Sequence, residues 1–345
     1  MLDDLKYIHQ KDTKDALGVV EKQYKQLQQN YSVNVGQINH IHNVVLAGMG
    51  GSALAAGLVK SWPALQVPFE VVRDYKIPAY VNTNTLFIAS SYSGNTEETL
   101  STLREAEAKQ AQIVVICAGG KLAEIASDKG YPLYTLPADY QPRMAVLFNF
   151  KALVDLFSQL SLTQKDAVTE LEHASEFARD YALGLRADVP TSQNVAKQIA
   201  LDLLGKSVVI YAGPFLSPVG YKWKINCNEN AKNVAWANQY PEFNHNEFLG
   251  WSSHPVDKPY AVVNLHSSTD GIRISSRFDI SKKLLGGRMP DPIEVKAEGS
   301  TPLEQMLSMI ILGDFVSVYL ALLNGLDPTP VELIEKLKQN LADIT

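Results

Sequence analysis

The chain has 345 residues, of which 46% are hydrophobic and 20% are charged, and its formal net charge is −6. This length exceeds one typical hydrophobic core and suits two domains of about 150 residues each. The composition is that of an ordinary globular protein, and no run approaches the roughly 20 uninterrupted apolar residues that span a bilayer. The negative charge and the lack of a Lys/Arg cluster disfavour nucleic acid as a partner. We therefore expect neither nucleic-acid nor membrane binding.

The cell compartment is predicted from the first residues and from the cysteines. The segment Met1–Lys6 lacks the basic start and apolar core of a signal peptide, so a cytoplasmic location is expected. Cys117 and Cys227 lie in apolar runs and form no disulfide framework, which fits a reducing compartment. Neither cysteine is a candidate nucleophile.

The first half of the chain alternates helix-like and strand-like segments. Residues 1–31 carry apolar side chains at helical spacing and predict an amphipathic helix. Short apolar runs bounded by turn residues then predict strands at 44–47, 69–72, 86–89 and 113–116. Helix-like segments lie between the first and second runs and between the third and fourth. This alternation predicts a doubly wound α/β domain, with a parallel sheet covered by helices on both faces.

The second half repeats this pattern after a helix-rich stretch at 144–204. The run at 208–213 mirrors that at 44–48, and each precedes a turn and a helix-like segment. This weak internal repeat suggests two copies of one architecture. Further strands of the second copy are predicted at 261–265 and 293–295.

The predicted fold class is therefore α/β, with two doubly wound parallel-sheet domains. The predicted divisions are an N-terminal helical segment, a first domain, a helical connection and a second domain, over residues 1–35, 36–160, 161–195 and 196–345. A C-terminal helix at 331–341 follows Pro328 and Pro330. Its apolar stripe is expected to be buried and consists of Val331, Leu333, Ile334, Leu337 and Leu341.

A glycine-rich loop follows the first predicted strand. Residues 48–53 read Gly-Met-Gly-Gly-Ser-Ala and open a helix, so the backbone can approach an anion closely and the helix N-terminus presents unpaired N–H groups. A tight turn without a ligand is an equally good interpretation of this loop alone. Gly48, Gly50 and Ala53 also satisfy the dinucleotide fingerprint, with Glu70 placed as a ribose-binding carboxylate. An NAD-dependent oxidoreductase is therefore one alternative function.

A second loop, at 90–99, reads Ser-Ser-Tyr-Ser-Gly-Asn-Thr-Glu-Glu-Thr and follows the third predicted strand. The hydroxyls of Ser91, Ser93 and Thr96, with the amides around Gly94, would form a neutral, donor-rich cradle for a terminal phosphate. The alternative is a Ser/Thr-capped helix start with two glutamates at the positive end of the helix dipole. The Gly-Lys-Ser/Thr of a Walker loop is missing, so nucleoside triphosphate hydrolysis is not supported.

Together, the two loops resemble the phosphosugar-binding signature of sugar isomerase (SIS) domains. The two motifs cover only the first predicted domain, and they imply that the loops hold the phosphate of a sugar. With the weak internal repeat, the predicted fold is two SIS-type domains. The residues that would bind this phosphate are Gly50, Gly51, Ser52, Ser91, Ser93 and Thr96. Because noncatalytic SIS proteins share such loops, a sugar-phosphate sensor is a second alternative function.

Two motifs in the second half favour catalysis. Residues 228–232 read Asn-Glu-Asn-Ala-Lys and residues 244–247 read Asn-His-Asn-Glu, and both are similar to catalytic motifs of the bifunctional phosphoglucose/phosphomannose isomerases. With the two loops in the same order, the resemblance spans most of the chain. It implies an aldose-ketose isomerase of carbohydrate metabolism, acting in glycolysis and gluconeogenesis. Its substrates would be hexose 6-phosphates, with glucose and mannose 6-phosphates each interconverted with fructose 6-phosphate.

The isomerisation moves a proton between two carbons through a cis-enediolate, and one carboxylate base can serve both carbons. Glu229 is the candidate base, and the alternative is a surface carboxylate paired with Lys232. Hexose phosphates are cyclic in water, so His245, which titrates in the useful range, is the candidate for ring opening. The resemblance implies that His245 reaches its site from the partner subunit, and hence a homodimer with shared active sites. The other histidines are interpreted as structural or solvated: His9, His40, His42, His173, His254 and His266.

Two basic residues complete the candidate catalytic set. Arg143 follows Pro142 and precedes an apolar helix-like run, so it is expected beside the carboxyl edge of the sheet, where it would stabilise the enediolate. Its position after proline matches the family's arginine, and an exposed charge at a helix start is the alternative. In the last helix, Lys338 borders the apolar stripe and Lys336 points away. The resemblance favours Lys338, in a Leu-Lys setting, as a helper in ring opening.

No metal and no other cofactor is expected, because the sequence holds no close ligand set such as His-x-x-x-His. The ratio of glucose to mannose activity cannot be predicted, since the two epimers differ only in the orientation of one hydroxyl. Thr329 is considered for this choice by loose analogy with a family threonine, and it is not counted among the site residues.

Overall fold

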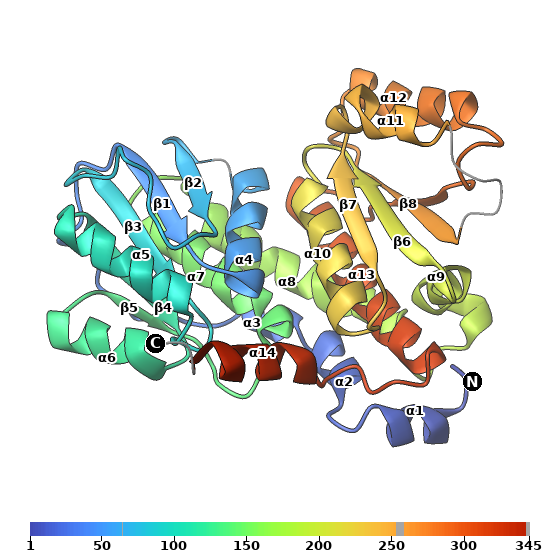
Figure 1. Ribbon diagram of the computed structural model, residues 1–345, viewed down its shortest axis with the longest axis horizontal. Coiled ribbons are helices and arrows are strands. Elements are labelled where there is room, and N and C mark those ends of the chain that lie inside the picture. The colour runs from blue at the N-terminus through green and yellow to red at the C-terminus, as the bar shows by residue number, and fades with distance from the viewer. Residues whose placement is uncertain (64, 253–258, 343–345) are drawn as a thin grey trace. The chain divides into compact units, whose positions relative to one another are not determined.

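The computed structural model describes residues 1–63, 65–252 and 259–342. The chain divides into two compact units. Unit 1 contains residues 1–21, 181–297 and 308–345, and unit 2 contains residues 22–180 and 298–307. Each unit holds one parallel sheet with helices (Figure 1), so the predicted fold class is confirmed. The domain boundaries expected from the sequence remain a prediction.

Unit 2 is built on a five-stranded parallel sheet in the order β2-β1-β3-β4-β5. Its strands are β1 Asn43–Ala47, β2 Phe69–Val72, β3 Thr85–Ser90, β4 Gln112–Cys117 and β5 Leu133–Thr135. Its helices are α3 Tyr24–Leu27, α4 Gly50–Ser61, α5 Glu97–Ala108, α6 Gly120–Lys129, η1 Pro142–Met144, α7 Val146–Gln159 and α8 Ala167–Leu183, whose last residues belong to unit 1. From β1 the chain adds β2 on one side and then β3, β4 and β5 on the other, which is the strand order of a doubly wound sheet.

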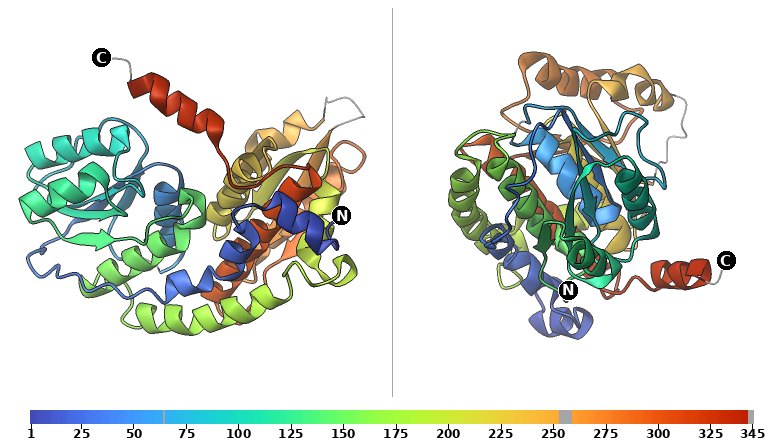
Figure 2. Two further views of the ribbon diagram at one scale, coloured as in Figure 1. Left: turned by 90° about the horizontal axis from the view of Figure 1, so that it is seen from below. Right: turned by 90° about the vertical axis from the view of Figure 1, so that its left-hand side faces the viewer.

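Helices cover both faces of this sheet (Figures 1 and 2). α5 and α6 pack on one face around a core that includes Phe87 and Val115, and α4 packs with α7 on the other. All six residues of β3 are buried as a result. This explains why the central strands read as continuous apolar runs rather than as an alternation of apolar and polar residues.

Unit 1 is built on a four-stranded parallel sheet in the order β7-β6-β8-β9. Its strands are β6 Ser207–Ala212, β7 Ala235–Gln239, β8 Tyr260–His266 and β9 Ile293–Lys296. Its other elements are α1 Leu5–Lys11, α2 Ala16–Glu21, η2 Thr191–Gln193, α9 Val195–Leu203, α10 Ser217–Glu229, η3 Glu242–His245, α11 Glu247–Gly250, α12 Ile272–Leu284, α13 Pro302–Leu323, of which Ser308 onward belongs to this unit, and α14 Glu332–Ala342. The order around β6 and β8 repeats that around β1 and β3, as the internal repeat predicted.

The N-terminal segment differs from the prediction, because three short helices replace the single amphipathic helix expected over 1–31. Asp12 caps the C-terminus of α1, and its carboxylate accepts hydrogen bonds from the backbone N–H groups of Ala16 (2.7 Å) and Leu17 (2.9 Å). Asp15 takes a positive φ of 53°. These local hydrogen bonds end one helix and begin the next. They compete with a continuous helix, and the spacing of apolar residues does not reveal them.

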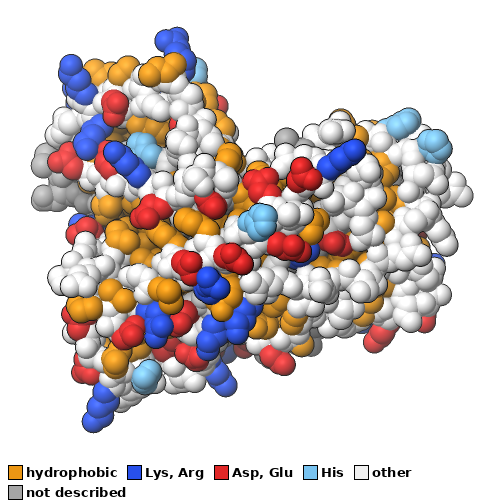
Figure 3. Space-filling model, turned by 180° about the vertical axis from the view of Figure 1, so that it is seen from behind, with side chains coloured by type: hydrophobic (Ala, Val, Ile, Leu, Met, Phe, Trp, Pro, Cys, Tyr) orange, Lys and Arg blue, Asp and Glu red, His pale blue; other side chains and the backbone are white. Residues whose placement is uncertain are grey.

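β5, β7 and α13 were not predicted. β5 has only three residues, and β7 reads Ala-Trp-Ala-Asn-Gln, which lacks a run of apolar residues. α13 is long and apolar enough to cross a membrane by length and composition, but 94% of its most apolar window is buried inside the protein. A buried core helix of a soluble protein has the same character. On the face shown in Figure 3, acidic, basic and hydrophobic side chains are interspersed.

Candidate active site

The first glycine-rich loop lies at the carboxyl end of β1, and Gly50 begins α4. Gly50 has a φ of +47°, which L side chains rarely adopt. A Cβ atom at Gly48 would lie 2.7 Å from the carbonyl oxygen of Ser90 and 3.2 Å from the Cβ of Ser52. Glycine at position 48 therefore allows the first loop to approach the start of the second. Ser52 itself is buried.

The second loop brings its three predicted hydroxyls together at the start of α5. The Ser91 hydroxyl oxygen lies 2.7 Å from that of Thr96 and 3.5 Å from that of Ser93. Thr96 occupies the N-cap position of α5, yet its side chain makes no capping hydrogen bond. The alternative of a Ser/Thr-capped helix is therefore not what the structure shows at Thr96. Its hydroxyl bonds to Ser91 instead, which groups the donors that a phosphate needs.

The loop after β4 holds this second loop in place. The side-chain oxygen of Asn95 accepts a hydrogen bond from the backbone N–H of Lys121 (3.0 Å), and the N–H of Leu122 donates to the carbonyl of Gly94 (3.0 Å). Gly94 has a φ of +69°, and a Cβ atom there would collide with the carbonyl of Gly119. The cradle thus depends on backbone packing between two neighbouring loops.

Tyr92 links the second loop to the segment that precedes Arg143. Its hydroxyl donates to the carbonyl oxygen of Pro137 (2.8 Å) and accepts from the backbone N–H of Tyr140 (2.9 Å). Burial raises the pKa of the Tyr92 hydroxyl, so it stays protonated and can donate at neutral pH.

Arg143 is only 2% exposed and lies in the short helix η1 just before α7. One guanidinium nitrogen donates to the side-chain oxygen of Gln141 (3.3 Å). A Cβ atom at Gly51 would collide with the carbonyl of Pro142 and lie 3.5 Å from the backbone nitrogen of Arg143. The structure therefore places Arg143 beside the first loop. The alternative of an exposed charge is wrong, because the residue is buried against that loop.

Glu229 is the last residue of α10 and is half-buried. The following turn is held by polar contacts: the Asn230 amide nitrogen donates to the hydroxyl of Ser317 (2.9 Å), and the Lys232 ammonium donates to backbone carbonyls, including that of Asp327 (2.8 Å). The Asn-Glu-Asn-Ala-Lys motif therefore supplies residues that anchor the chain immediately after the Glu229 carboxylate.

His245 is exposed at the end of η3, between anchored neighbours. The Asn244 side chain donates to the hydroxyl of Ser281 (2.8 Å) and accepts from Arg277 (2.9 Å), and Phe243 is fully buried in an aromatic core. The backbone on the N-terminal side of His245 is thus fixed, while its imidazole faces solvent. Among the other histidines, His9, His40, His42 and His173 are exposed, His266 hydrogen-bonds to a glutamate, and His254 lies outside the described residues.

The C-terminal end of α10 and the carboxyl end of β7 lie at opposite ends of the parallel strands in unit 1 (Figure 1). α10 follows the carboxyl end of β6 and returns to the amino end of β7, which runs parallel to β6. Glu229 therefore lies at the amino edge, whereas His245 follows the carboxyl end of β7. The five residues of β7 separate these edges by roughly 16 Å at about 3.3 Å per residue. The topology of one chain does not bring the two side chains together.

The C-terminal helix contradicts one prediction. Its apolar stripe was expected to be buried, but Leu333 is 82% and Leu337 is 58% exposed. Periodicity shows that a helix has an apolar face, but it does not show which surface covers that face. No described residue buries the apolar face of α14. Lys336 and Lys338 are both exposed, so burial does not distinguish them. Thr329, just before the helix, is half-buried.

Within residues 1–63, 65–252 and 259–342, no group of three or more His, Cys, Asp or Glu side chains could hold a metal ion. Glu70, the ribose-binding candidate of the dinucleotide alternative, accepts a hydrogen bond from the Tyr80 hydroxyl (2.5 Å). The strand order begins 2-1-3, as in flavodoxin-like sheets, and differs from the 3-2-1-4-5-6 order of classical dinucleotide-binding domains.

Comparison with known protein families identifies both halves of the chain. Residues 37–150 match the SIS domain, and residues 192–341 match the bacterial phospho-glucose isomerase C-terminal SIS domain. The protein is thus a two-domain SIS protein. A glucose-6-phosphate isomerase like protein from Thermus thermophilus has the same fold, with a TM-score of 0.66 at 18% sequence identity over 96% of this chain and 99% of that one.

Whole-chain relatives are more specific. A bifunctional phosphoglucose/phosphomannose isomerase from Caldicellulosiruptor bescii is 39% identical over 94% of this chain and 96% of its own length. One from Aquifex aeolicus is 35% identical over 86% of this chain and 90% of its own length. The chain belongs to the bifunctional phosphoglucose/phosphomannose isomerase family, and the resemblance inferred from the motifs is confirmed.

Proposed function

We propose that the protein is a cytoplasmic, cofactor-independent isomerase that interconverts glucose 6-phosphate and mannose 6-phosphate with fructose 6-phosphate. Family membership supports an isomerase over both the noncatalytic sensor and the NAD-dependent oxidoreductase. The observation that carries the proposal is the cluster in unit 2, where the hydroxyls of Ser91, Ser93 and Thr96 converge. The buried Arg143 adjoins the first loop, which also approaches the start of the second.

In this proposal the two loops bind the phosphate through neutral donors. Backbone N–H groups at the starts of α4 and α5 and the loop hydroxyls hold the dianion, which the positive ends of two helix dipoles also favour. The phosphate does not react, so it is held equally in the ground state and the transition state. The phosphate-binding residues are Gly50, Gly51, Ser52, Ser91, Ser93 and Thr96.

The proposed chemical steps are ring opening and proton transfer. His245, with Lys338 as helper, moves a proton between the ring oxygen and the anomeric hydroxyl, and this opens the ring. The Glu229 carboxylate then removes the proton from the second carbon of the aldose, giving a cis-enediolate whose negative charge Arg143 stabilises. Returning the proton to the first carbon yields the ketose. The enediolate is planar at the second carbon, so reprotonation of that carbon on either face yields glucose or mannose 6-phosphate.

The positions of Glu229 and His245 support a homodimer with shared sites. They lie at opposite edges of the unit 1 sheet within one chain, so a site that uses both would take them from two copies. The elements around His245 carry exposed apolar side chains, among them Leu249 (74% exposed) and Ile272 (78%), which suits a surface that associates with a second copy.

Product analysis is the direct test of the proposed function. Purified protein is incubated with each hexose 6-phosphate in the presence of a chelator, and the products are separated. We expect each of the three substrates to yield the other two. Formation of no product from any of them would refute the proposal and favour a sensor. A change in NADH fluorescence on titration with the protein would instead favour the oxidoreductase.

Subunit mixing tests the shared site. Glu229→Gln and His245→Ala should each be nearly inactive alone. When equal amounts are mixed, unfolded and refolded, about half of the dimers pair one chain of each kind. One of the two sites in such a dimer combines intact Glu229 with intact His245, so about one quarter of wild-type activity per chain should return if the sites act independently. Mixed dimers that are confirmed by mass spectrometry and show no recovery would exclude a shared site.

A further inference from the structure

α10, which ends at Glu229, is joined to α13 by a buried polar network within unit 1. Lys222 is 1% exposed and Asp314 is 5% exposed, and the lysine ammonium donates to the aspartate carboxylate. The Asn226 amide nitrogen donates to the same carboxylate oxygen. One turn later, Asn230 donates to the Ser317 hydroxyl (2.9 Å), which in turn donates to the backbone carbonyl of Asp314 (2.8 Å).

This network fixes how the two helices meet. Lys222, Asn226 and Asn230 are spaced by four residues, so they form one stripe on α10. Beside this stripe, the indole nitrogen of Trp223 donates to the carbonyl of Met309 (2.8 Å). A Cβ atom at Gly313 would collide with this indole ring, so the indole can pack against α13 only where that helix has a glycine. A carboxylate that must accept from two directed donors permits one register of the helices, whereas purely apolar contacts tolerate sliding.

Stability alone does not account for the buried charges. Taking both ions out of water costs several kcal/mol each, and replacing such a pair by apolar residues of similar volume is often neutral or stabilising. A net gain in stability is therefore not needed to explain this pair, and its directed hydrogen bonds suit a role in positioning the helices. What it sets in this fold is the rotation and axial position of α10.

Glu229 depends on that position. It lies seven residues after Lys222, about 10 Å further along the helix axis, and between the stripe residues Asn226 and Asn230 in sequence. We propose that Lys222, Asp314 and Asn226 are positioning residues that hold the Glu229 carboxylate at the reacting carbon without touching the substrate. This inference rests on the proposed function. Because a displacement of about 1 Å can lower a rate a hundredfold, a small shift of α10 would suffice to impair proton transfer.

The decisive experiment distinguishes an effect on the position of Glu229 from an effect on the stability of the fold. Lys222→Met alone leaves the Asp314 carboxylate buried without its lysine, and we expect a clear fall in Tm. Lys222→Met combined with Asp314→Leu removes both charges at similar volume, and we expect Tm to recover most of that fall, although the buried Asn226 amide loses its acceptor. The kcat of this double variant should stay about a hundredfold below wild type, with KM changed less than about threefold, because the phosphate loops are untouched. Wild-type kcat in the stable double variant would overturn the inference.

Two further variants distinguish a loss of positioning from general destabilisation. Asn226→Ala keeps the ion pair and removes one donor to Asp314, so it should fold even if the double variant does not, and we expect a kcat lowered about tenfold. Lys197→Met is the matched control in the same unit, because this buried lysine donates to the carbonyls of Ala187 (2.8 Å) and Val189 (2.8 Å) and to the carboxylate of Asp3 (3.0 Å), none of which belongs to α10. It should lower Tm while leaving kcat unchanged. Equal kcat losses in Lys197→Met and Asn226→Ala would mean general destabilisation and would refute positioning.

Hydrogen exchange provides a readout that does not need activity. In the double variant, the backbone amides of the last turn of α10 should exchange faster than in wild type at equal Tm. Unchanged exchange there would also count against the inference. An inactive wild-type protein would refute the proposed function, whereas an active wild type with a fully active double variant would refute only the positioning role.

Discussion

At the scale of residues, Thr96 is one of the three clustered hydroxyls proposed to bind the substrate phosphate. Thr96→Val is nearly isosteric and removes a donor that lies 2.7 Å from Ser91. Because the phosphate is bound equally in both states, we expect KM to rise about tenfold with kcat nearly unchanged, by steady-state kinetics. Thr102→Val on the same helix, where the hydroxyl donates to the carbonyl of Glu98 (2.9 Å), is the matched control and should leave KM unchanged. A loss confined to kcat would contradict the assignment.

Arg143 supplies the positive charge in the proposed enediolate step. Arg143→Met keeps an unbranched apolar stem and removes the charged guanidinium, so we expect kcat to fall by about a hundredfold or more. Turnover is compared with that of Arg104→Met, which removes an exposed arginine from α5 in the same unit. Circular dichroism should show that both variants are folded. Wild-type turnover in Arg143→Met would remove this residue from the mechanism.

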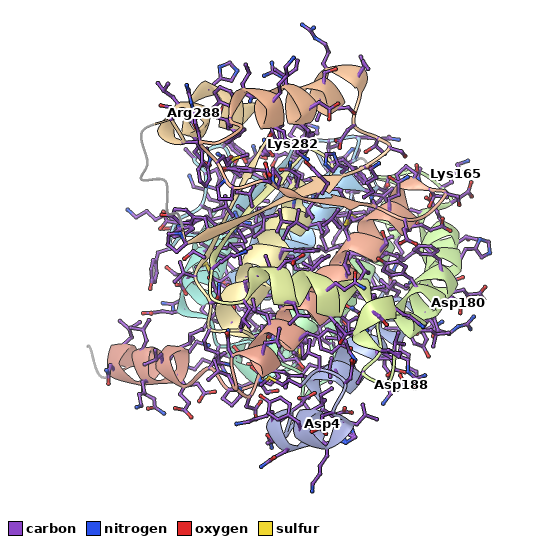
Figure 4. The ribbon with its side chains drawn as sticks, turned by 90° about the vertical axis from the view of Figure 1, so that its right-hand side faces the viewer. Asp4, Lys165, Asp180, Asp188, Lys282 and Arg288 are labelled. Carbon is purple, nitrogen blue, oxygen red and sulfur yellow. The ribbon has the colours of Figure 1, made fainter. Side chains whose placement is uncertain are left out.

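Glu294 makes stability depend on pH. Burial alone would raise the pKa of its carboxyl, but hydrogen bonds from His266, Asn264 and Lys282 outweigh that effect and lower the pKa below the ordinary 4.5. Figure 4 labels Lys282, whose ammonium lies 3.2 Å from Glu294. A lowered pKa in the folded state adds stability above the unfolded value, and this stability is lost as pH falls through the folded value.

Glu294→Gln should therefore lower Tm relative to wild type at pH 7. The difference should shrink as pH falls from about 5 to about 3, because wild type then loses the same charge. Thermal unfolding of both proteins across this range tests the prediction. A Tm difference that does not vary with pH would show that the carboxylate charge is not responsible.

At the scale of elements, the loops after β3 and β4 contact each other at Gly94 and Gly119, and we expect this contact to shape the proposed phosphate cradle. Gly94→Ala would introduce a Cβ that collides with Gly119, and it would also strain a φ of +69°. Gly130→Ala strains a similar φ of +70°, but a Cβ there meets nothing within 4 Å. We expect both variants to lose about 1 kcal/mol of stability from backbone strain, and only Gly94→Ala to raise KM strongly. Equal KM values would mean that the loop contact does not shape the cradle.

At the scale of the whole molecule, the proposed mechanism requires association. We expect the protein to be at least a dimer at working concentration, as measured by size-exclusion chromatography with light scattering. Leu284 (59% exposed) and Ile280 (55%) lie on α12, whose Arg277 contacts Asn244 beside His245, so an interface there would also cover apolar surface. Leu284→Glu should weaken this association and lower activity together. A strictly monomeric protein with full activity would exclude the shared site.

Sequence alone determined the architecture and most of the candidate site. The strands around Val45 and Val209 could be predicted because helices cover both faces of each sheet, which requires continuous apolar runs between turn residues. The loops at 48–53 and 90–99 could be recognised because phosphate binding requires glycines and hydroxyls at the start of a helix. Family motifs then pointed to Glu229 and His245, whose roles are still to be tested.

Tertiary structure decided what depends on contacts between residues far apart in sequence. Only the fold shows that Arg143 is buried beside Gly51, because neither its charge nor its spacing reports burial. The pairing of Lys222 with Asp314 joins residues 92 positions apart, and no local pattern encodes such a contact. Periodicity correctly predicted the helix containing Leu337, yet it was wrong about the burial of that residue. An apolar stripe records that a face is apolar, and burial depends on what the rest of the molecule places against it.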